Sequence, residues 1–405
     1  MDTASSLCIR RLFVVRGLRA FGDGYVSLLL PVYLTALGLD PFQVGVIATG
    51  TLIGSGCLAL IVGLHAWRFR YRTLLLLACA LMAATGLGFA AFRDFWPLLV
   101  VAVAGTLNPS SGDVSVFLPL EQAVLARVVP DGQRTAVFAR YSLIGTLVGA
   151  LGALFAGSAE FLAGATHLGI RTALQAMFLL YGLLGAASGH IYRKLPADVA
   201  VEAAAPRSAL HRSKGRVYIL AALFSLDAFA GGFIVQSMLA LWLYQRYHLS
   251  LGAAGAIFFW TGILSALSYL AAVYIARRIG LVNTMVYTHL ASSALLVSTP
   301  FAPGLGWVIA LLLARSALSQ MDVPTRSSYV MAVVSPSERA AAASITSVPR
   351  SLAASASPLI AGWWLGISAF GWPLLAAGGI KIVYDLLLLS LFRSVRPPEE
   401  RPHPP

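Results

Sequence analysis

Five carboxylates lie inside four long apolar stretches of this 405-residue chain, where an ionised side chain is costly. They are Asp23, Asp113, Glu121, Asp227 and Asp322. A carboxyl group in apolar surroundings can exchange its proton near neutral pH, which is the chemistry that proton binding requires. The residue types therefore predict proton-binding or substrate-binding sites, with hydrogen-bonded structural carboxyl groups as the alternative.

Asp23 and Asp227 fit proton binding best, because each lies near the middle of its apolar stretch. Asp113 lies in the segment NPSSGDVS, whose asparagine and serines are typical of an irregular turn with side-chain hydrogen bonds. Asp322 differs, because Arg326 follows four residues later on the same helical face. Mutual neutralisation of Asp322 and Arg326 is therefore the alternative to a functional contact.

The elements that carry these residues are predicted to be transmembrane helices. The composition is 58% hydrophobic and 11% charged, which excludes a soluble enzyme. A hydrocarbon core about 30 Å thick needs about 20 apolar residues per helix. The apolar runs have this length and lack the alternation of barrel strands. Twelve spans are predicted, over residues 12–38, 42–65, 71–92, 97–127, 134–163, 169–193, 215–245, 250–277, 282–300, 304–334, 338–366 and 370–393.

Basic residues are distributed unevenly between the predicted loops, and this sets the orientation. With a cytoplasmic N-terminus, 19 of the 29 Lys and Arg fall on the cytoplasmic side, three on the opposite side and seven inside the spans. Such an excess follows the positive-inside rule, so the net charge of +13 indicates membrane orientation and not nucleic-acid binding. Both termini are expected in the cytoplasm.

The sequence carries no nucleotide-binding motif, and its three cysteines have no metal-type spacing. We therefore expect neither a cofactor nor a metal. The expected partners are a small molecule, protons and the lipid bilayer, and the protein is expected to be a monomer. The excess of 26 Arg over 3 Lys, with abundant Ala, is typical of a GC-rich bacterial genome. The expected location is the bacterial inner membrane.

The second half of the chain repeats the first. The segment FLPLEQAVLARVVPDGQR at 117–134 aligns with DVPTRSSYVMAVVSPSER at 322–339, an offset of 205 residues. Six spans are duplicated, and because six is even the two repeats have the same orientation. We predict an N-terminal six-helix lobe over 1–193, a cytoplasmic linker over 194–214 and a C-terminal six-helix lobe over 215–405.

Twelve spans in two parallel sets of six, with a central linker, resemble the major facilitator superfamily over essentially the whole chain. The segment GLHAWRFRYR keeps Gly63, Arg68 and Arg72 of the loop motif of that family, with tryptophan in place of its aspartate. The segment ARRIG keeps Arg277 and Arg278. The resemblance implies that spans 1, 4, 7 and 10 line a central cavity, and the five acids lie on these spans. Glycines of span 5 resemble a motif of the drug/proton antiporter branch, with helix packing as the alternative.

The repeat also relates charged residues of the two halves. The alignment places Glu121 and Arg326 at equivalent depth, where opposite charges could attract across the central axis as a gate between the lobes. The alternative partner of Glu121 is Arg140 on the adjacent span 5. Lys381 and Asp385, four residues apart on span 12, are expected to form a structural pair.

We therefore predict a secondary transporter that works by alternating access and exports a small organic compound with protons as the coupling ion. A second hypothesis is transport of an anionic solute, with Arg326, Arg350 and Arg140 binding the anion. Arg350 is equally suited to a neighbouring acid. A third hypothesis, from another class, is a membrane receptor or scaffold that moves no solute. The cost of placing charges inside a membrane favours transport.

Overall fold

The computed structural model describes residues 3–65, 69–110, 115–129, 131–167, 169–195, 214–334 and 339–392. These residues form α-helices and one short 3-10 helix, and none of them lies in a strand. The chain folds into two compact units. The first consists of Met1–Ala203 with Val235–Phe259, and the second of Ala204–Ile234 with Trp260–Pro405.

The first unit is built around α1, which packs along α6 and α8, while α3 packs along α8 and α2 along α4. α10 also packs against α1, so residues 235–259 complete this unit although they follow the predicted linker in sequence. That linker lies almost entirely outside the described residues, and the predicted lobe boundary stays a prediction. The helices of the unit are α1 (Thr3–Ala36), α2 (Pro41–His65), α3 (Tyr71–Ala91), α4 (Phe95–Ala104), α5 (Phe117–Val128), α6 (Asp131–Phe155), α7 (Ser158–Thr166), α8 (Ile170–Tyr192), α10 (Gln236–Tyr247) and the start of α11 (Leu251–Ile279).

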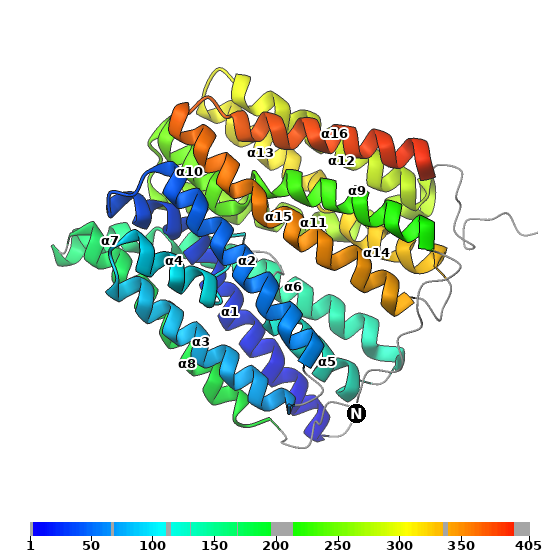
Figure 1. The fold of residues 1–405 in the computed structure, drawn as a ribbon, viewed down its shortest axis with the longest axis horizontal. Coiled ribbons are helices and arrows are strands. Elements are labelled where there is room, and N and C mark those ends of the chain that lie inside the picture. Colours follow the sequence, from blue (N-terminus) through cyan, green and yellow to red (C-terminus); the bar gives the residue numbers. More distant parts are fainter. Residues whose placement is uncertain are drawn as a thin grey trace, which may run out of the picture. The chain divides into compact units, whose positions relative to one another are not determined.

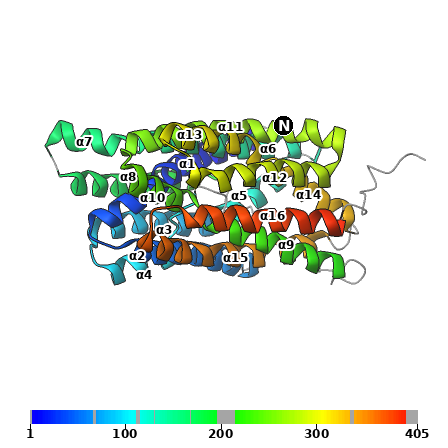
Figure 2. The same cartoon turned by 90° about the horizontal axis from the view of Figure 1, so that it is seen from above.

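In the second unit α9 runs beside α15, as Figure 1 shows, and α12 runs beside α16, as the view in Figure 2 also shows. A buried apolar core fills the space between α9, α12, α14 and α16, with Phe224, Met285, Tyr329 and Tyr384 among its members. The elements of the unit are α9 (Lys214–Gly232), the remainder of α11, α12 (Leu281–Ser298), η2 (Thr299–Phe301), α13 (Leu305–Ser319), α14 (Asp322–Val333), α15 (Arg339–Ile367) and α16 (Trp372–Phe392).

The predicted spans coincide with these helices, each span with one helix or with an interrupted pair. Seven described segments are long and apolar enough to cross a membrane by length and composition, and the shorter helices Phe95–Ala104 and Leu305–Ser319 are apolar as well. Spans 4, 5, 7 and 10 are interrupted, as α4 and α5, α6 and α7, α9 and α10, and α13 and α14. Span 11 stays one helix although it contains Pro349 and Pro358.

The two units repeat the same internal packing. In the first, α1 packs along α6 at a close approach where a Cβ on Gly24 would collide with the carbonyl oxygen of Gly149. In the second, α9 packs along α15, and a Cβ on Gly232 would collide with the carbonyl oxygen of Ala354. Gly149 and Ala354 are 205 residues apart, which is the offset of the sequence repeat. The packing therefore supports the duplication predicted from the sequence.

The interruptions in spans 4 and 10 begin at residues that favour turns. After α4, the Asn108 side-chain oxygen accepts hydrogen bonds from the backbone nitrogen of Ser110 at 3.1 Å and from its hydroxyl at 2.7 Å. Such an Asx turn competes with helical hydrogen bonding. In span 10 the chain restarts at Asp322 with Pro324 in the first turn of α14, where a missing backbone N–H is tolerated. Both breaks place polar groups in the interior of an apolar span.

Candidate functional site

Asp227 is the centre of a buried charged network in the second unit. It lies on α9 and is 4% exposed. One carboxylate oxygen accepts a hydrogen bond from the Lys381 ammonium of α16 at 2.6 Å, and the other accepts one from the Arg326 guanidinium of α14 at 2.9 Å. Two cations on two different helices therefore hold one acid, and all three side chains are buried.

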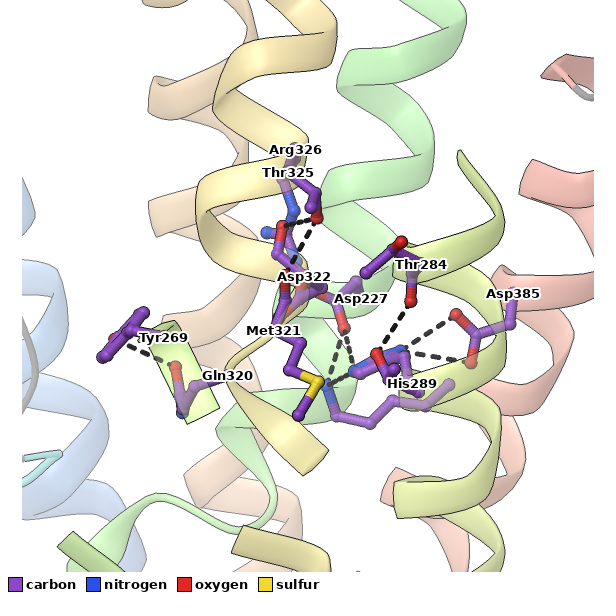
Figure 3. A network of polar contacts seen from close by, with 12 residues as sticks. Asp227, Tyr269, Thr284, His289, Gln320, Met321, Asp322, Thr325, Arg326 and Asp385 are labelled. Carbon is purple, nitrogen blue, oxygen red and sulfur yellow. Dashed lines mark hydrogen bonds and ion pairs between the residues drawn. The ribbon is translucent and has the colours of Figure 1, made fainter. Parts of the chain in front are cut away.

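Arg326 extends the network along α14. Its guanidinium also binds the carboxylate of Asp322, one helical turn earlier. Its charged group lies 5.1 Å from the centre of the Phe224 ring, in the range of a cation–π contact. The i,i+4 pairing of Asp322 with Arg326 expected as one alternative is thus present, and Arg326 bridges it to Asp227, as the labelled side chains of Figure 3 show.

His289 on α12 connects Asp227 to a second acid. The ring atom Nδ1 lies 2.9 Å and 3.1 Å from the two carboxylate oxygens of Asp385. The other ring nitrogen, Nε2, lies 3.3 Å from the Lys381 ammonium and 3.6 Å from the Asp227 carboxylate. Figure 3 shows the His289 ring between Asp227 and Asp385. The network therefore joins α9, α12, α14 and α16.

The expected structural pair on α16 is corrected by these contacts. Lys381 and Asp385 are four residues apart, yet Lys381 binds Asp227 on α9 and Asp385 binds His289 on α12. The physical reason is that a contact within one exposed helix contributes only about 0.2–0.5 kcal/mol, whereas a buried charge requires a close partner of opposite sign. Lys381 is thus part of the site, which sequence reasoning did not foresee.

Arg350 is the exposed cation beside this network. It lies on α15, and its side chain is exposed, in contrast to the buried Arg326. It interacts electrostatically with Asp227, Asp322 and Arg326, so it lies on the side of α15 that faces the network. Because a charged side chain in a membrane protein faces the bundle interior or a water-filled cavity, Arg350 is placed where a solute could reach it.

A second buried cluster lies in the first unit, around Glu121 of α5. Its carboxylate accepts hydrogen bonds from the Arg19 guanidinium of α1 and from the hydroxyl groups of Tyr141 on α6 and Tyr192 on α8. Arg19 also lies 4.1 Å from the centre of the Phe117 ring. Glu121 is fully buried and Arg19 is 2% exposed. One acid thus joins four helices.

The arginine that binds Glu121 is Arg19, and not Arg140, the alternative partner suggested by the sequence. Arg140 is exposed, while Arg19 points into the unit from α1. Sequence reasoning missed Arg19 although it lies inside span 1, one helical turn before Asp23. Its signal was the same as that of the acids, a charge in an apolar span. The predicted gate between Glu121 and Arg326 stays a prediction, since each residue has an ion partner in its own unit.

Asp23 lies one helical turn after Arg19, the ion partner of Glu121. It is half-buried on α1, and the Tyr181 hydroxyl lies 3.4 Å from its carboxylate and 3.2 Å from the carbonyl oxygen of Thr106. Asp23 therefore faces α8 and the interruption of span 4. Asp113, the other predicted acid of span 4, lies outside the described residues.

The residues of the predicted loop motifs are described only in part. Arg68 lies outside the described residues, and the side chains of Gly63 and Arg277 are likewise not described. Arg72 is half-buried at the start of α3. Arg278 is exposed and binds the hydroxyl of Tyr274, one turn earlier on α11. These contacts are local and do not test a role of the motif in transport.

Comparison with known proteins gives one family. The sequence profile described as Major Facilitator Superfamily matches residues 12–318. "Uncharacterized membrane protein YJR124C" of Saccharomyces cerevisiae is 27% identical over 414 residues, covering 93% of this chain and 92% of that protein.

Solved structures agree with this match. The fold is similar to that of the nucleoside transporter NupG, with a TM-score of 0.77 and 15% identity over 95% of this chain and 100% of that chain. It is also similar to the human organic anion transporter MFSD10 (TETRAN), with a TM-score of 0.67 and 18% identity over 96% of this chain and 100% of that chain. At these identities the likeness concerns the fold alone.

Proposed function

Because this chain belongs to the major facilitator superfamily, a family of membrane transporters, we propose that it moves a small organic solute across the membrane with protons as the coupling ion. The family membership confirms the resemblance inferred from the sequence and the all-helical, multi-pass membrane fold. It also identifies the chain as a transporter and not an enzyme. Proton coupling, direction and the residues involved are the proposal.

The observation that supports proton coupling is the position of Asp227 between two cations. Its two carboxylate oxygens hold Lys381 and Arg326, which come from different helices. Protonation would remove the negative charge that keeps both cations in place, since a neutral carboxyl group attracts a cation far less than a carboxylate does. Proton binding at Asp227 would therefore loosen α14 and α16 from α9, which is a local change that alternating access could use.

Asp23 and Asp322 are further candidates for proton binding in the same proposal. Asp23 is half-buried and has the Tyr181 phenol as a near neighbour, and it is less enclosed than Asp227. Asp322 is buried and bound to Arg326, so its protonation would change the same network as that of Asp227. Asp227 is the acid whose protonation would change the most contacts, and because its two cation partners favour the ionised form, proton uptake there requires one of them to move away.

Proteoliposomes that contain a pH-sensitive dye test the proposal. Nucleosides, organic anions and amphipathic organic cations are added in turn, and proton movement is recorded. One class should move protons, and Asp227→Asn should lower that rate at least about tenfold, equivalent to about 1.4 kcal/mol. Asp94→Asn is the matched control, because Asp94 is exposed and its side chain forms no cap hydrogen bond. Full proton movement in Asp227→Asn would contradict the assignment.

We further propose that the protein is a monomeric exporter of the bacterial inner membrane, with both termini in the cytoplasm. The orientation is supported by the distribution of the 29 Lys and Arg among the loops. Export is supported by the glycine series of span 5 alone. Gly149 and Gly152 of that series pack against α1, which equally supports a packing role. Uptake into inverted vesicles, where an exporter accumulates its solute in the lumen, distinguishes export from import.

A second candidate function is transport of an anionic solute, and the exposure of Arg350 favours it. The acids of the network are already matched, Asp227 by Lys381 and Arg326, and Asp322 by Arg326. Arg350 is the network cation that is exposed. A transporter of similar fold is named for organic anions. The receptor or scaffold hypothesis predicts instead that no solute class crosses the proteoliposome membrane.

A further inference from the structure

We propose that His289 is a proton-operated switch that decides whether Lys381 or the imidazole ring binds Asp227. The inference rests on the proposed proton coupling and adds a residue that the sequence analysis did not select. It concerns one carboxylate oxygen of Asp227, which lies 2.6 Å from the Lys381 ammonium and 3.6 Å from His289 Nε2. Both groups thus compete for one acceptor.

The neutral ring has one tautomer that satisfies its contacts. Nδ1 lies 2.9 Å and 3.1 Å from the two oxygens of Asp385, and an ionised carboxylate only accepts hydrogen bonds. Nδ1 therefore carries the hydrogen, and Nε2 is left as an acceptor. The Lys381 ammonium, 3.3 Å away, is a donor and supplies the hydrogen bond that Nε2 accepts. In this state Lys381 donates to both His289 and Asp227.

Addition of a proton to Nε2 reverses the role of that atom. The Nε2–H group then faces the ammonium at 3.3 Å, so that two donors and two positive charges oppose each other. The acceptor nearest to Nε2 in the network is the Asp227 oxygen, at 3.6 Å. A small ring movement therefore lets His289 donate to Asp227, and Lys381 must leave. One proton from water thus exchanges one cation partner of Asp227 for another.

The helices around His289 supply the groups that set the charge balance. With neutral His289, the carboxylates of Asp227, Asp322 and Asp385 equal in number the cations Lys381, Arg326 and Arg350, so the added proton gives the cluster one excess positive charge. Asp385, bound directly to the ring, is the group that offsets it. The charged and titratable groups on the helices that pack against α12 are Arg315 on α13, Asp322, Arg326 and Tyr329 on α14, and Lys381, Tyr384 and Asp385 on α16, and the network adds Asp227 of α9 and Arg350 of α15.

Displacement of Lys381 has a consequence beyond the ring. Lys381 lies on α16 and Asp227 on α9, so their contact joins these two helices. His289 lies on α12, which packs along α16. After the exchange, Asp227 is tied to α12 and its tie to α16 is lost. The switch therefore converts a proton into a change of helix pairing inside the second unit.

The first measurement is nitrogen-15 NMR of histidine-labelled protein in lipid nanodiscs between about pH 5 and pH 8. The signal of His289 is identified by its loss in His289→Gln, and Asp385→Asn gives a second route through its changed tautomer ratio. We expect the Nδ1–H tautomer at the alkaline end and a doubly protonated ring at the acidic end. A ring that stays neutral throughout, or carries its hydrogen on Nε2 when neutral, overturns the switch.

Two variants test the competition itself. In Lys381→Gln the repelling ammonium is absent, so His289 should take up its proton at higher pH than in the unchanged protein. His190→Gln serves as the control, because His190 is an exposed histidine on α8 and lies in the first unit. An identical titration of His289 in the Lys381→Gln variant and the unchanged protein would contradict the competition.

Solute-driven proton movement separates this inference from the proposed function. If the unchanged protein couples a solute to protons and His289→Gln keeps the same pH profile, the switch is wrong and the proposed function stands. If no solute moves protons but His289 titrates as expected, proton-coupled transport is wrong and the switch stands as a pH response. We expect coupling in the unchanged protein and a flattened pH profile in His289→Gln.

Discussion

Arg19 and Asp227 occupy equivalent positions in the two repeats and carry opposite charges. Arg19 lies five residues before Gly24 and Asp227 five residues before Gly232, and these glycines make the matching close approaches to span 5 and span 11. Their partners, Glu121 and Arg326, are themselves related by the offset of 205 residues. Each unit thus holds an ion pair between the first and fourth spans of its repeat, with the polarity reversed.

The first unit should lose stability when its ion pair is broken. Glu121→Gln and Arg19→Gln each leave an uncompensated charge in a buried place, which costs about 3–5 kcal/mol. We expect a large fall in the melting temperature of the detergent-solubilised protein for both variants. Arg140→Gln changes an exposed arginine of α6 and should leave the melting temperature within about 1 °C, because exposed substitutions cost under about 0.5 kcal/mol. Equal falls in all three variants would show that the burial of the pair is not the cause.

The stability losses from removing the two phenol hydroxyl groups at Glu121 should not be additive. Tyr141→Phe and Tyr192→Phe each remove a hydrogen bond to a charged acceptor, worth about 1.5–3 kcal/mol. Because both donate to the same carboxylate, the double variant should differ from the sum of the single ones. A double-mutant cycle on thermal unfolding measures this difference. Strict additivity would mean that the two hydroxyl groups act independently of one another although both donate to Glu121.

The transmembrane spans and the internal duplication could be predicted from the sequence, because each depends on the chain alone. A span needs enough apolar residues to cross the bilayer, and the offset of 205 residues is a property of the letters. The charged residues were selected for a similar reason, since each is costly in its own span. The family comparison agrees with these inferences at the level of the fold.

The partners of the charges were not readable, because they depend on how helices rotate against one another. Glu121 of α5 binds Arg19 of α1 and not Arg140, and Lys381 binds Asp227 and not Asp385. The local i,i+4 rule held for Asp322 and Arg326, and Arg326 reaches Asp227 of α9 at the same time. His289 carries no sequence signal, since a single histidine in an apolar span is compatible with ordinary packing.

The close approach of α9 to α15 should tolerate no side chain at Gly232. A Cβ there would collide with the backbone carbonyl of Ala354, which cannot move aside as a flexible side chain can. We expect Gly232→Ala to lower the melting temperature strongly. Gly231→Ala is the neighbouring control, because a Cβ at Gly231 meets nothing within 4 Å. It should be neutral or stabilising, since alanine is favoured over glycine in a helix by about 0.5–1 kcal/mol. The reverse order of the two variants would contradict the observed packing.

Arg350 should decide whether organic anions bind. A ligand that binds the folded protein raises its melting temperature by mass action, by an amount equivalent to about 2.7 kcal/mol at 100 times its Kd. If the second candidate function holds, aromatic carboxylates and nucleotides will raise the melting temperature and the matched amines will not. Arg350→Gln should abolish the shift and leave the unliganded protein almost unchanged, because the side chain is exposed.

The design of the Arg350 experiment separates charge from shape. Arg350→Lys keeps the charge but loses the planar, two-pronged donor geometry, so it should retain a reduced shift for carboxylates and phosphates. Arg171→Gln removes an exposed arginine at the start of α8 and controls for the loss of a surface charge. Anion shifts that persist in Arg350→Gln would move anion recognition away from this residue. Shifts lost equally in Arg171→Gln would reduce the effect to net charge, whereas loss in Arg350→Gln alone would place the anion beside the Asp227 network.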